Sequence, residues 1–195
     1  MNPKEIPEIL FETRAQWRQW LSENGEKEQG IWLVYYKKTS GKPHLSYDEG
    51  VEEALCFGWI DSKPNLVDDE KSKLYYSPRK PKSNWSKVNK TRVTKLLALG
   101  LMTNAGMKMI DLAKKIGTWD ALNDVDNLVI PDDLKAALQS LQNAETNFDA
   151  FPASTKRGIL EWILNAKTTE TRTKRILETA TLAAQNIRAN QYVRK

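Results

Sequence analysis

The chain has 195 residues, a length that fits one domain or one domain with a small helical addition. Hydrophobic residues make up 40% of it, enough for a packed core, and the net charge of +5 is compatible with an anionic partner without requiring one. One cysteine and one histidine exclude an internal disulfide and a His/Cys zinc site within a single chain, so we expect no metal and no cofactor.

Targeting and membrane signals are absent from the sequence. No stretch approaches the ~20 apolar residues of a membrane-spanning helix, and the N-terminus lacks the apolar core of a signal peptide. The single cysteine, Cys56, lies in an apolar run and is expected to be a buried, inert thiol. We therefore expect a cytoplasmic protein without a membrane span. Its oligomeric state does not follow from the sequence.

The first hundred residues predict a small β-sheet with two helices. Thr13 with Gln16, and Ser46 with Glu49, have the spacing of a capping box, which begins a helix at each position. The second of these helices is expected to end at Gly58. Runs rich in β-forming residues predict strands at 6–12, 31–37 and 59–60, and a hairpin of 65–68 with 73–77.

After the hairpin, apolar residues recur at helical spacing. Ser83 or Asn84 is expected to cap a helix that ends at Gly100, and Thr103 and Ser154 are expected to cap two later helices.

The acidic stretch 119–129 is expected to be irregular. These elements predict the α+β class, with a small N-terminal β-sheet with two helices followed by a mainly helical C-terminal half. The expected domains are residues 1–100 and 101–195, although the boundary could also fall within 119–130.

The segment 77–95, called the basic segment below, contains seven Lys or Arg and no Asp or Glu. Arg79 follows Pro78, which restrains the backbone, and its planar guanidinium matches a phosphate or a carboxylate. Trp85 could stack on a base, an interaction worth about 1–3 kcal/mol. The expected ligand-binding residues are Arg79, Lys82, Asn84, Trp85, Lys87 and Lys90. The alternative is a solvated loop whose Trp85 packs into the core.

Asp61 follows the predicted strand at 59–60 and is a candidate catalytic base at the rim of the sheet. It could instead form an ion pair with Arg79, which would lower the pKa of its carboxyl and disfavour a base that works near neutral pH. A third possibility is that Asp61 only caps a turn.

A second basic cluster lies in the C-terminal half. Arg172 and Arg175 fall near one face of the helix predicted from Thr168 onward. They either form a solvated face or line the same anion pocket as Arg79.

Four motifs in this order make the chain resemble the bacterial YdeI/OmpD-associated family, also called the bacteriocin-protection family. They are ALCFGWIDS at 54–62, SPRKPKSNWSKVNK at 77–90, LMTNAG at 101–106 and WILNAKTTETRTKRI at 162–176. The likeness runs from about Phe11 to Ile187, with Leu101 in place of the arginine that members more often carry. The resemblance implies a role in stress or antimicrobial-peptide resistance and supplies no catalytic residue.

Three functions are compatible with these observations. The first is a protein that binds an anionic small molecule or a nucleic acid through the basic segment. The second is an enzyme on a phosphorylated metabolite, with Asp61 or Glu53 as its acid or base. The third, implied by the resemblance, is a stress-response module that binds a protein partner. Because the sequence contains no nucleotide-binding or hydrolase motif, it favours a binding protein over an enzyme.

Overall fold

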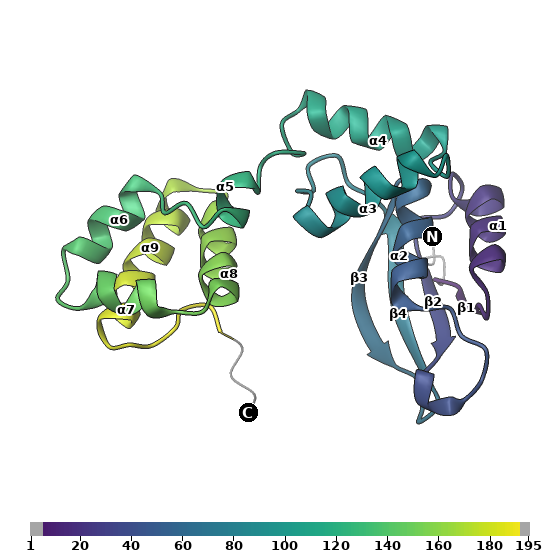
Figure 1. The fold of residues 1–195 in the computed structure, drawn as a ribbon, viewed down its shortest axis with the longest axis horizontal. Helices are drawn as coiled ribbons and strands as arrows, with labels where there is room; N and C mark the ends of the chain where they lie inside the picture. Colours follow the sequence, from purple (N-terminus) through teal and green to yellow (C-terminus); the bar gives the residue numbers. More distant parts are fainter. Residues whose placement is uncertain (1–5, 192–195) are drawn as a thin grey trace, which may run out of the picture. The chain divides into compact units, whose positions relative to one another are not determined.

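The computed structural model describes residues 6–191, and the chain divides into two compact units between Asp120 and Ala121. Unit 1 consists, in its described part, of β1 (Glu8–Leu10), α1 (Arg14–Asn24), β2 (Ile31–Tyr36), the short 3-10 helix η1 (Lys38–Ser40), α2 (Tyr47–Cys56), β3 (Trp59–Leu66), β4 (Lys71–Pro78), α3 (Lys87–Ala98) and α4 (Asn104–Lys115). Unit 2 consists of α5 (Asn123–Asp126), α6 (Asp132–Gln139), α7 (Ala144–Ala150), α8 (Ala153–Leu164) and α9 (Thr169–Ala184) (Figure 1). The predicted α+β class is confirmed.

The sheet of unit 1 has the strand order β1-β2-β4-β3, with β1 parallel to β2 and the other pairs antiparallel. Because side chains alternate along a strand, Ile31 and Leu33 of β2 share a face with Leu74 and Tyr76 of β4, and all four are buried. This face packs against the helices, and Figure 1 shows α2 lying across the strands.

Both predicted capping boxes are confirmed, at Thr13 for α1 and at Ser46 for α2. The strands around 59–68 were predicted wrongly, because one strand, β3, covers both the run at 59–60 and the first half of the run at 65–68. The pairing of β3 with β4 shifts register between Asp61 and Pro64, which absorbs the residues that looked like a break. Pro64 is tolerated because β3 is an edge strand, where its missing N–H is not needed.

The start of α3 also differs from the prediction. Its N-cap is Ser86, whose side chain accepts from the N–H of Asn89 at 3.3 Å, rather than Ser83 or Asn84. The reason is tertiary, because the carbonyl of Asn84 accepts a hydrogen bond from Arg79 and holds this residue outside the helix.

Two predictions in the C-terminal half need correction. The acidic stretch 119–129 is not wholly irregular, since it contains α5. The N-cap of α8 is Pro152 and not Ser154, and it makes no side-chain capping bond. By contrast, Thr103 caps α4 as predicted, and Thr168 caps α9 by accepting from the N–H of Thr171 at 3.1 Å.

The division between Asp120 and Ala121 falls within the alternative boundary range 119–130 and places helix α4 in unit 1. The hydroxyl of Thr103 and its backbone N–H donate to the carbonyl of Cys56, at 2.6 and 3.1 Å. Gly106 lies so close to that carbonyl that a Cβ there would approach the oxygen within 2.3 Å. These contacts join α4 to the end of α2. None of the described helices combines the length and hydrophobicity that a membrane span needs.

Candidate ligand-binding site

The end of β4 places Arg79 beside the turn that leads into β3. The backbone N–H of Arg79 donates to the carbonyl of Gly58 at 2.9 Å, and Gly58 has a φ of +74°, a conformation that favours glycine. Asp61 lies in β3, two residues after Trp59, and it pairs with Tyr76 of β4. The predicted candidates, Asp61 of β3 and Arg79 directly after β4, therefore lie in one region of unit 1.

The side chain of Arg79 is buried, with 4% of its surface exposed. Its Nη2 donates to the carbonyl of Asn84, and its guanidinium carbon lies 3.8 Å from the ring centroid of Trp85. Nε and Nη1 are buried and have no hydrogen-bond partner among the residues that the structure describes. Burial lowers the pKa of this guanidinium to about 10, a shift that the negative charge of Asp61 opposes.

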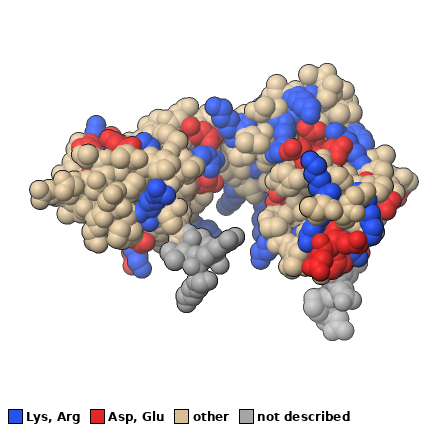
Figure 2. Space-filling view, turned by 60° about the horizontal axis from the view of Figure 1, so that its bottom comes forward, with Lys and Arg blue, Asp and Glu red and all other residues tan. Residues whose placement is uncertain are grey.

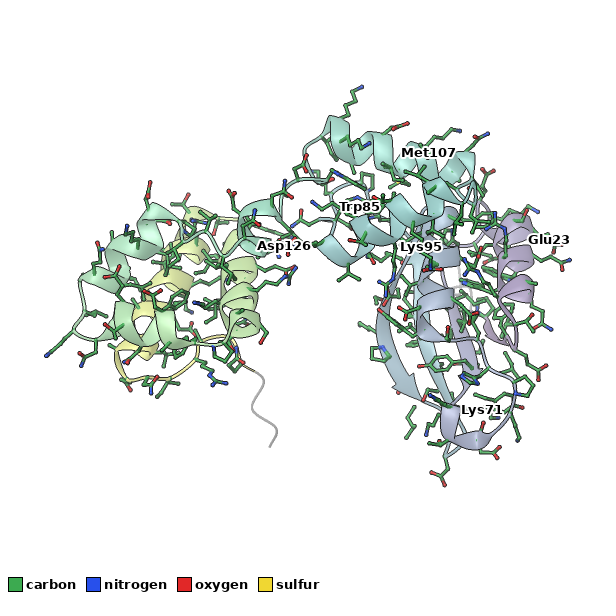
Figure 3. All side chains as sticks on the ribbon, in the orientation of Figure 1. Glu23, Lys71, Trp85, Lys95, Met107 and Asp126 are labelled. Carbon is green, nitrogen blue, oxygen red and sulfur yellow. The ribbon has the colours of Figure 1, made fainter. Side chains whose placement is uncertain are left out.

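Trp85 is a core residue, with 2% of its surface exposed (Figure 3). Its ring lies 5.0 Å from that of Trp119, and its backbone N–H donates to the carbonyl of Thr118 at 3.3 Å. With Arg79 on one side and Trp119 on another, the indole presents no open face to a base. This placement corresponds to the packing alternative and not to a stacking platform.

The lysines of the predicted site do not converge on Arg79. Lys82 and Lys87 are exposed, whereas Lys90 lies 3.9 Å from Asp120 and 5.9 Å from the ring centroid of Trp119. Figure 2 shows Lys and Arg side chains interspersed with acidic ones on the face it presents. The basic segment thus contributes one buried cation, Arg79, and several exposed ones around it.

Asp61 has a partner that the sequence did not reveal. The hydroxyl of Tyr47, the first residue of α2, donates to Asp61 Oδ2 at 3.0 Å. Asp61 interacts electrostatically with Arg79, but the described residues contain no direct ion pair between them. Partial burial raises the pKa of the Tyr47 hydroxyl, and the charge of Asp61 adds to this effect. No spacing rule connects Tyr47 with Asp61, because only the folding of α2 against β3 brings them together.

Arg92 of α3 completes the polar surroundings of Tyr47. Its guanidinium carbon lies 5.8 Å from the ring centroid of Tyr47, and its nitrogens donate to Asp48 and, at 3.0 Å, to Asn89. Arg92 lies in the basic segment but was not among the predicted ligand-binding residues. Its charge is already paired with a carboxylate, in contrast to that of Arg79.

The alternative acid, Glu53, forms ion pairs inside unit 1. Only 1% of it is exposed, and its oxygens accept from Arg14 at 2.5 Å and from Arg18 at 2.6 Å. The neighbouring Glu52 is also buried and binds Arg14 and Lys95. Because both carboxylates neutralise cations that tie α1 and α3 to α2, Glu53 is not free for proton transfer.

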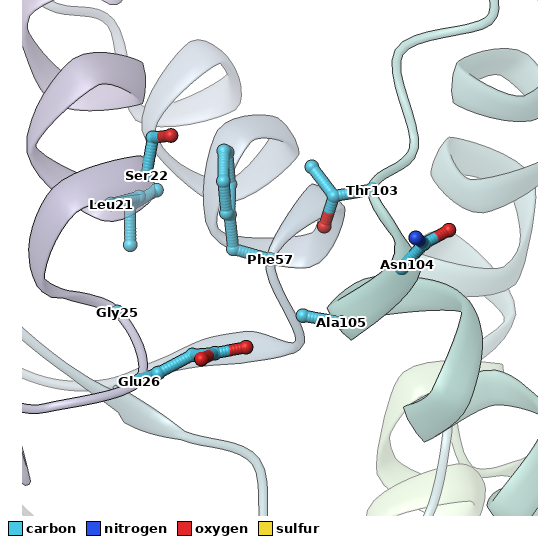
Figure 4. Close-up of a pocket in the computed structure, with 8 residues that line it drawn as sticks. All are labelled: Leu21, Ser22, Gly25, Glu26, Phe57, Thr103, Asn104 and Ala105. Atoms are coloured by element: carbon cyan, nitrogen blue, oxygen red, sulfur yellow. The ribbon is translucent and has the colours of Figure 1, made fainter.

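A groove lies elsewhere in unit 1, where α1, the end of α2 and the start of α4 meet. It consists of two hollows, of about 290 and 430 Å³, that share Ser22, Phe57 and Thr103. Figure 4 shows the hydroxyls of Ser22 and Thr103, the amide of Asn104 and the carboxylate of Glu26 around the ring of Phe57. No predicted site residue lines this groove, and the sequence analysis did not find it.

Arg172 and Arg175 belong to unit 2 and have partners there. Arg172 donates to both oxygens of Asp133, at 2.7 and 2.9 Å, and Arg175 donates to the carbonyl of Trp162 while lying 5.0 Å from its ring centroid. These contacts favour a structural role for both arginines. No cluster of three potential metal ligands occurs among the described residues.

Two family models match the chain. Residues 9–109, more than half of the chain, match a domain of unknown function (DUF8412), and residues 127–186 match the family described as bacteriocin-protection, YdeI or OmpD-associated. The chain belongs to the DUF8412 family, and its second unit is similar to the YdeI/OmpD-associated family over residues 127–186. Searches of curated proteins and of solved structures gave no match.

The predicted YdeI/OmpD-associated resemblance is therefore confirmed. The YdeI/OmpD-associated match contains only the last of the four motifs, WILNAKTTETRTKRI at 162–176. The other three, with Asp61 and the predicted ligand-binding residues, lie in the DUF8412 region. Neither family description states a ligand or a reaction.

Proposed function

We propose that unit 1 binds a small anionic ligand that carries a phosphate group, and that Arg79 of the basic segment contacts this group. The observation that supports this is the buried guanidinium whose Nε and Nη1 have no partner in the described part of the chain. A buried donor without a partner costs about 1–3 kcal/mol, and more when the group is charged. An anion at either nitrogen would supply the missing acceptor, and an ion is one of the explanations that such unpaired groups in native proteins require.

The ligand must reach atoms that are closed from solvent beneath segment 80–86. Hydrogen bonds hold this segment, among them those from the N–H of Ser83 to the carbonyl of Lys80 at 3.0 Å, from the hydroxyl of Thr118 to the carbonyl of Pro81 at 3.4 Å and from the N–H of Trp85 to the carbonyl of Thr118 at 3.3 Å. Local opening of the segment, which costs less than global unfolding, would admit the ligand. Exposed Lys82 and Lys87 would attract the anion before Arg79 binds it. Because the ring of Trp85 is covered, a small phosphate compound has more support than a nucleic acid.

Calorimetric titration of the full chain with inorganic phosphate, AMP, ATP and an oligothymidylate tests the proposal. Arg79→Met keeps the length of the side chain and removes the charge, and Arg79→Lys keeps the charge without the planar fork. Lys38→Met is the matched control, because Lys38 is an exposed cation in η1, outside the basic segment. We expect Arg79→Met to weaken phosphate or nucleotide binding at least about tenfold, with the control unchanged.

Two results would contradict the proposal. One is a folded wild-type chain that binds no phosphate compound, and the other is undiminished binding by Arg79→Met. Binding of the oligothymidylate alone, weakened by Lys82→Met and Lys87→Met but not by Arg79→Met, would favour a nucleic-acid surface instead.

The hydrogen bond from Tyr47 to Asp61 supports a second candidate, an enzyme that acts on the phosphorylated ligand with Asp61 as general base. Asp61→Asn would then abolish turnover of a bound phosphate ester while binding persists.

The description of the family matched by unit 2 supports a third candidate, a protein-interaction module in stress or antimicrobial resistance. Loss of a co-purifying protein in Arg172→Glu/Arg175→Glu, with phosphate binding and the thermal unfolding of unit 2 unchanged, would favour that function.

A further inference from the structure

We infer that the ligand held at Arg79 carries an amino group in addition to its phosphate, and that the carboxylate of Asp61 receives this amino group. This inference rests on the proposed function and specifies the class of ligand, a small amino phosphate. Its basis is a positive and a negative side chain that lie near one another without neutralising each other.

The carboxylate of Asp61 has acceptor capacity to spare. An ionised carboxylate offers about four lone-pair sites, and the contact described for Asp61 is the single hydrogen bond from Tyr47 at 3.0 Å. Asp61 is only partly buried, so a ligand can approach it.

The protein's own cations do not pair directly with Asp61. The charge of Asp61 acts on the guanidinium of Arg79, but Arg79 donates to the carbonyl of Asn84, and Arg92 donates to Asp48 and Asn89. The hydroxyl of Tyr47 has one proton, which it already donates to Asp61. Within the described residues, the polar surroundings of Asp61 therefore lack a cation in contact with it.

The negative charge of Asp61 disfavours a ligand that carries negative charge alone. A phosphate close enough to bind Arg79 would also feel the charge of Asp61, and like charges in a partly buried site repel. An ammonium group on the same ligand replaces this repulsion with an attraction to Asp61, while the phosphate supplies the missing acceptor to Arg79. An amino phosphate is thus preferred over a phosphate of equal size.

Propyl phosphate and phosphoethanolamine provide a matched pair of probes, because they differ by a methyl group in place of the ammonium. We expect the wild-type chain to bind phosphoethanolamine at least about fivefold more tightly, a preference that Asp61→Asn reduces to within about twofold. Tyr47→Phe, which removes the hydrogen bond but keeps the carboxylate, should retain the preference. Thermal unfolding of each variant verifies that it is folded.

Equal or tighter binding of propyl phosphate by the wild type overturns the inference while leaving the proposed function intact. A preference for phosphoethanolamine that survives in Asp61→Asn overturns it as well. If neither probe binds while inorganic phosphate, AMP or ATP does, the inference fails and the proposed function stands. If Arg79→Met binds both probes as the wild type does, the proposed function fails and the inference with it.

The same amino phosphate chemistry occurs in free metabolites and in the ethanolamine headgroup of lipids. Co-sedimentation with phosphatidylcholine vesicles, with and without phosphatidylethanolamine, separates these sources. Sedimentation that requires phosphatidylethanolamine and Asp61 assigns the headgroup, and binding of free phosphoethanolamine without sedimentation assigns the metabolite.

Discussion

The guanidinium of Arg79 and the indole of Trp85 form a buried cation–π pair, with the guanidinium carbon 3.8 Å from the ring centroid. The two residues are separated by only six positions in the sequence, and the carbonyl of Asn84 between them accepts from the same guanidinium. The pair closes segment 80–86 against the core of unit 1. Its energetics determine how readily the proposed ligand reaches Arg79.

We expect Arg79→Met to change the stability of unit 1 by less than about 1 kcal/mol. The lost cation–π contact, worth about 2 kcal/mol when desolvated, is offset by removal of buried donors that lack partners, which cost about 1–3 kcal/mol. Trp85→Ala should instead cost about 3–5 kcal/mol, because it leaves a large cavity in the core. Urea denaturation measures both. A loss from Arg79→Met as large as that from Trp85→Ala would show that the arginine is a structural residue.

Gly106→Ala should destabilise unit 1 although alanine favours helices. The added Cβ would lie 2.3 Å from the carbonyl oxygen of Cys56, a backbone atom that cannot move aside without separating α4 from α2. Gly158→Ala in α8 is the matched control, since nothing lies within 4 Å of its Cβ and the helix gains about 0.5–1 kcal/mol. We expect Gly106→Ala to lower the free energy of unfolding and Gly158→Ala to raise it. Two changes of the same sign would contradict the close contact between Gly106 and Cys56.

Cys56 should react slowly with thiol reagents in the folded protein. Burial raises the pKa of its thiol from 9.0 to about 11, so little thiolate exists at neutral pH. Since folding raises this pKa, the stabilising contribution is fully present below pH 9.0 and is lost as the pH rises through about 11. Cys56→Ala should therefore show a smaller loss of stability than the wild type in this interval. Rapid labelling of the native chain at pH 8 would refute the burial of the thiol.

In unit 2, the ion pair of Arg172 with Asp133 should make the free energy of unfolding depend on pH in the acidic range. The hydrogen bonds from Arg172 lower the pKa of the Asp133 carboxyl below 3.8, so the contribution is present above pH 3.8 and disappears as the pH falls through the folded-state value. Both side chains are partly exposed, and we expect only about 0.5–1 kcal/mol at pH 7. Asp133→Asn should show this loss at pH 7 and little at pH 2. An equal loss at both pH values would mean that the carboxylate charge is irrelevant.

Local signals predicted local structure well. The capping boxes at Thr13 and Ser46 work within four residues, so the sequence alone was sufficient to locate the starts of α1 and α2. The same reasoning missed the continuity of β3, which runs from the predicted strand at 59–60 through Pro64 into the predicted hairpin, because a proline in a strand is tolerated only where the strand lies at the sheet edge.

The candidate site was predictable only in part. The run of like charges and the position of Asp61 after an apolar strand were visible in the sequence. The hydrogen bond from Tyr47 and the ion pairs of Glu53 were not visible in the sequence, because each joins residues 14 or more positions apart.

The amino-acid sequence by itself determined the fold class, the helix starts at Thr13 and Ser46, and the resemblance of unit 2 to the YdeI/OmpD-associated family, because periodicity, capping and motifs act over short distances along the chain. Only the tertiary structure decided which cation of the basic segment is buried and which carboxylates are already paired. Burial and pairing depend on what the remainder of the fold places around a side chain. Arg79 lies against Trp85 while Lys82 and Lys87 extend into solvent, although all three belong to one continuous run of positive charge.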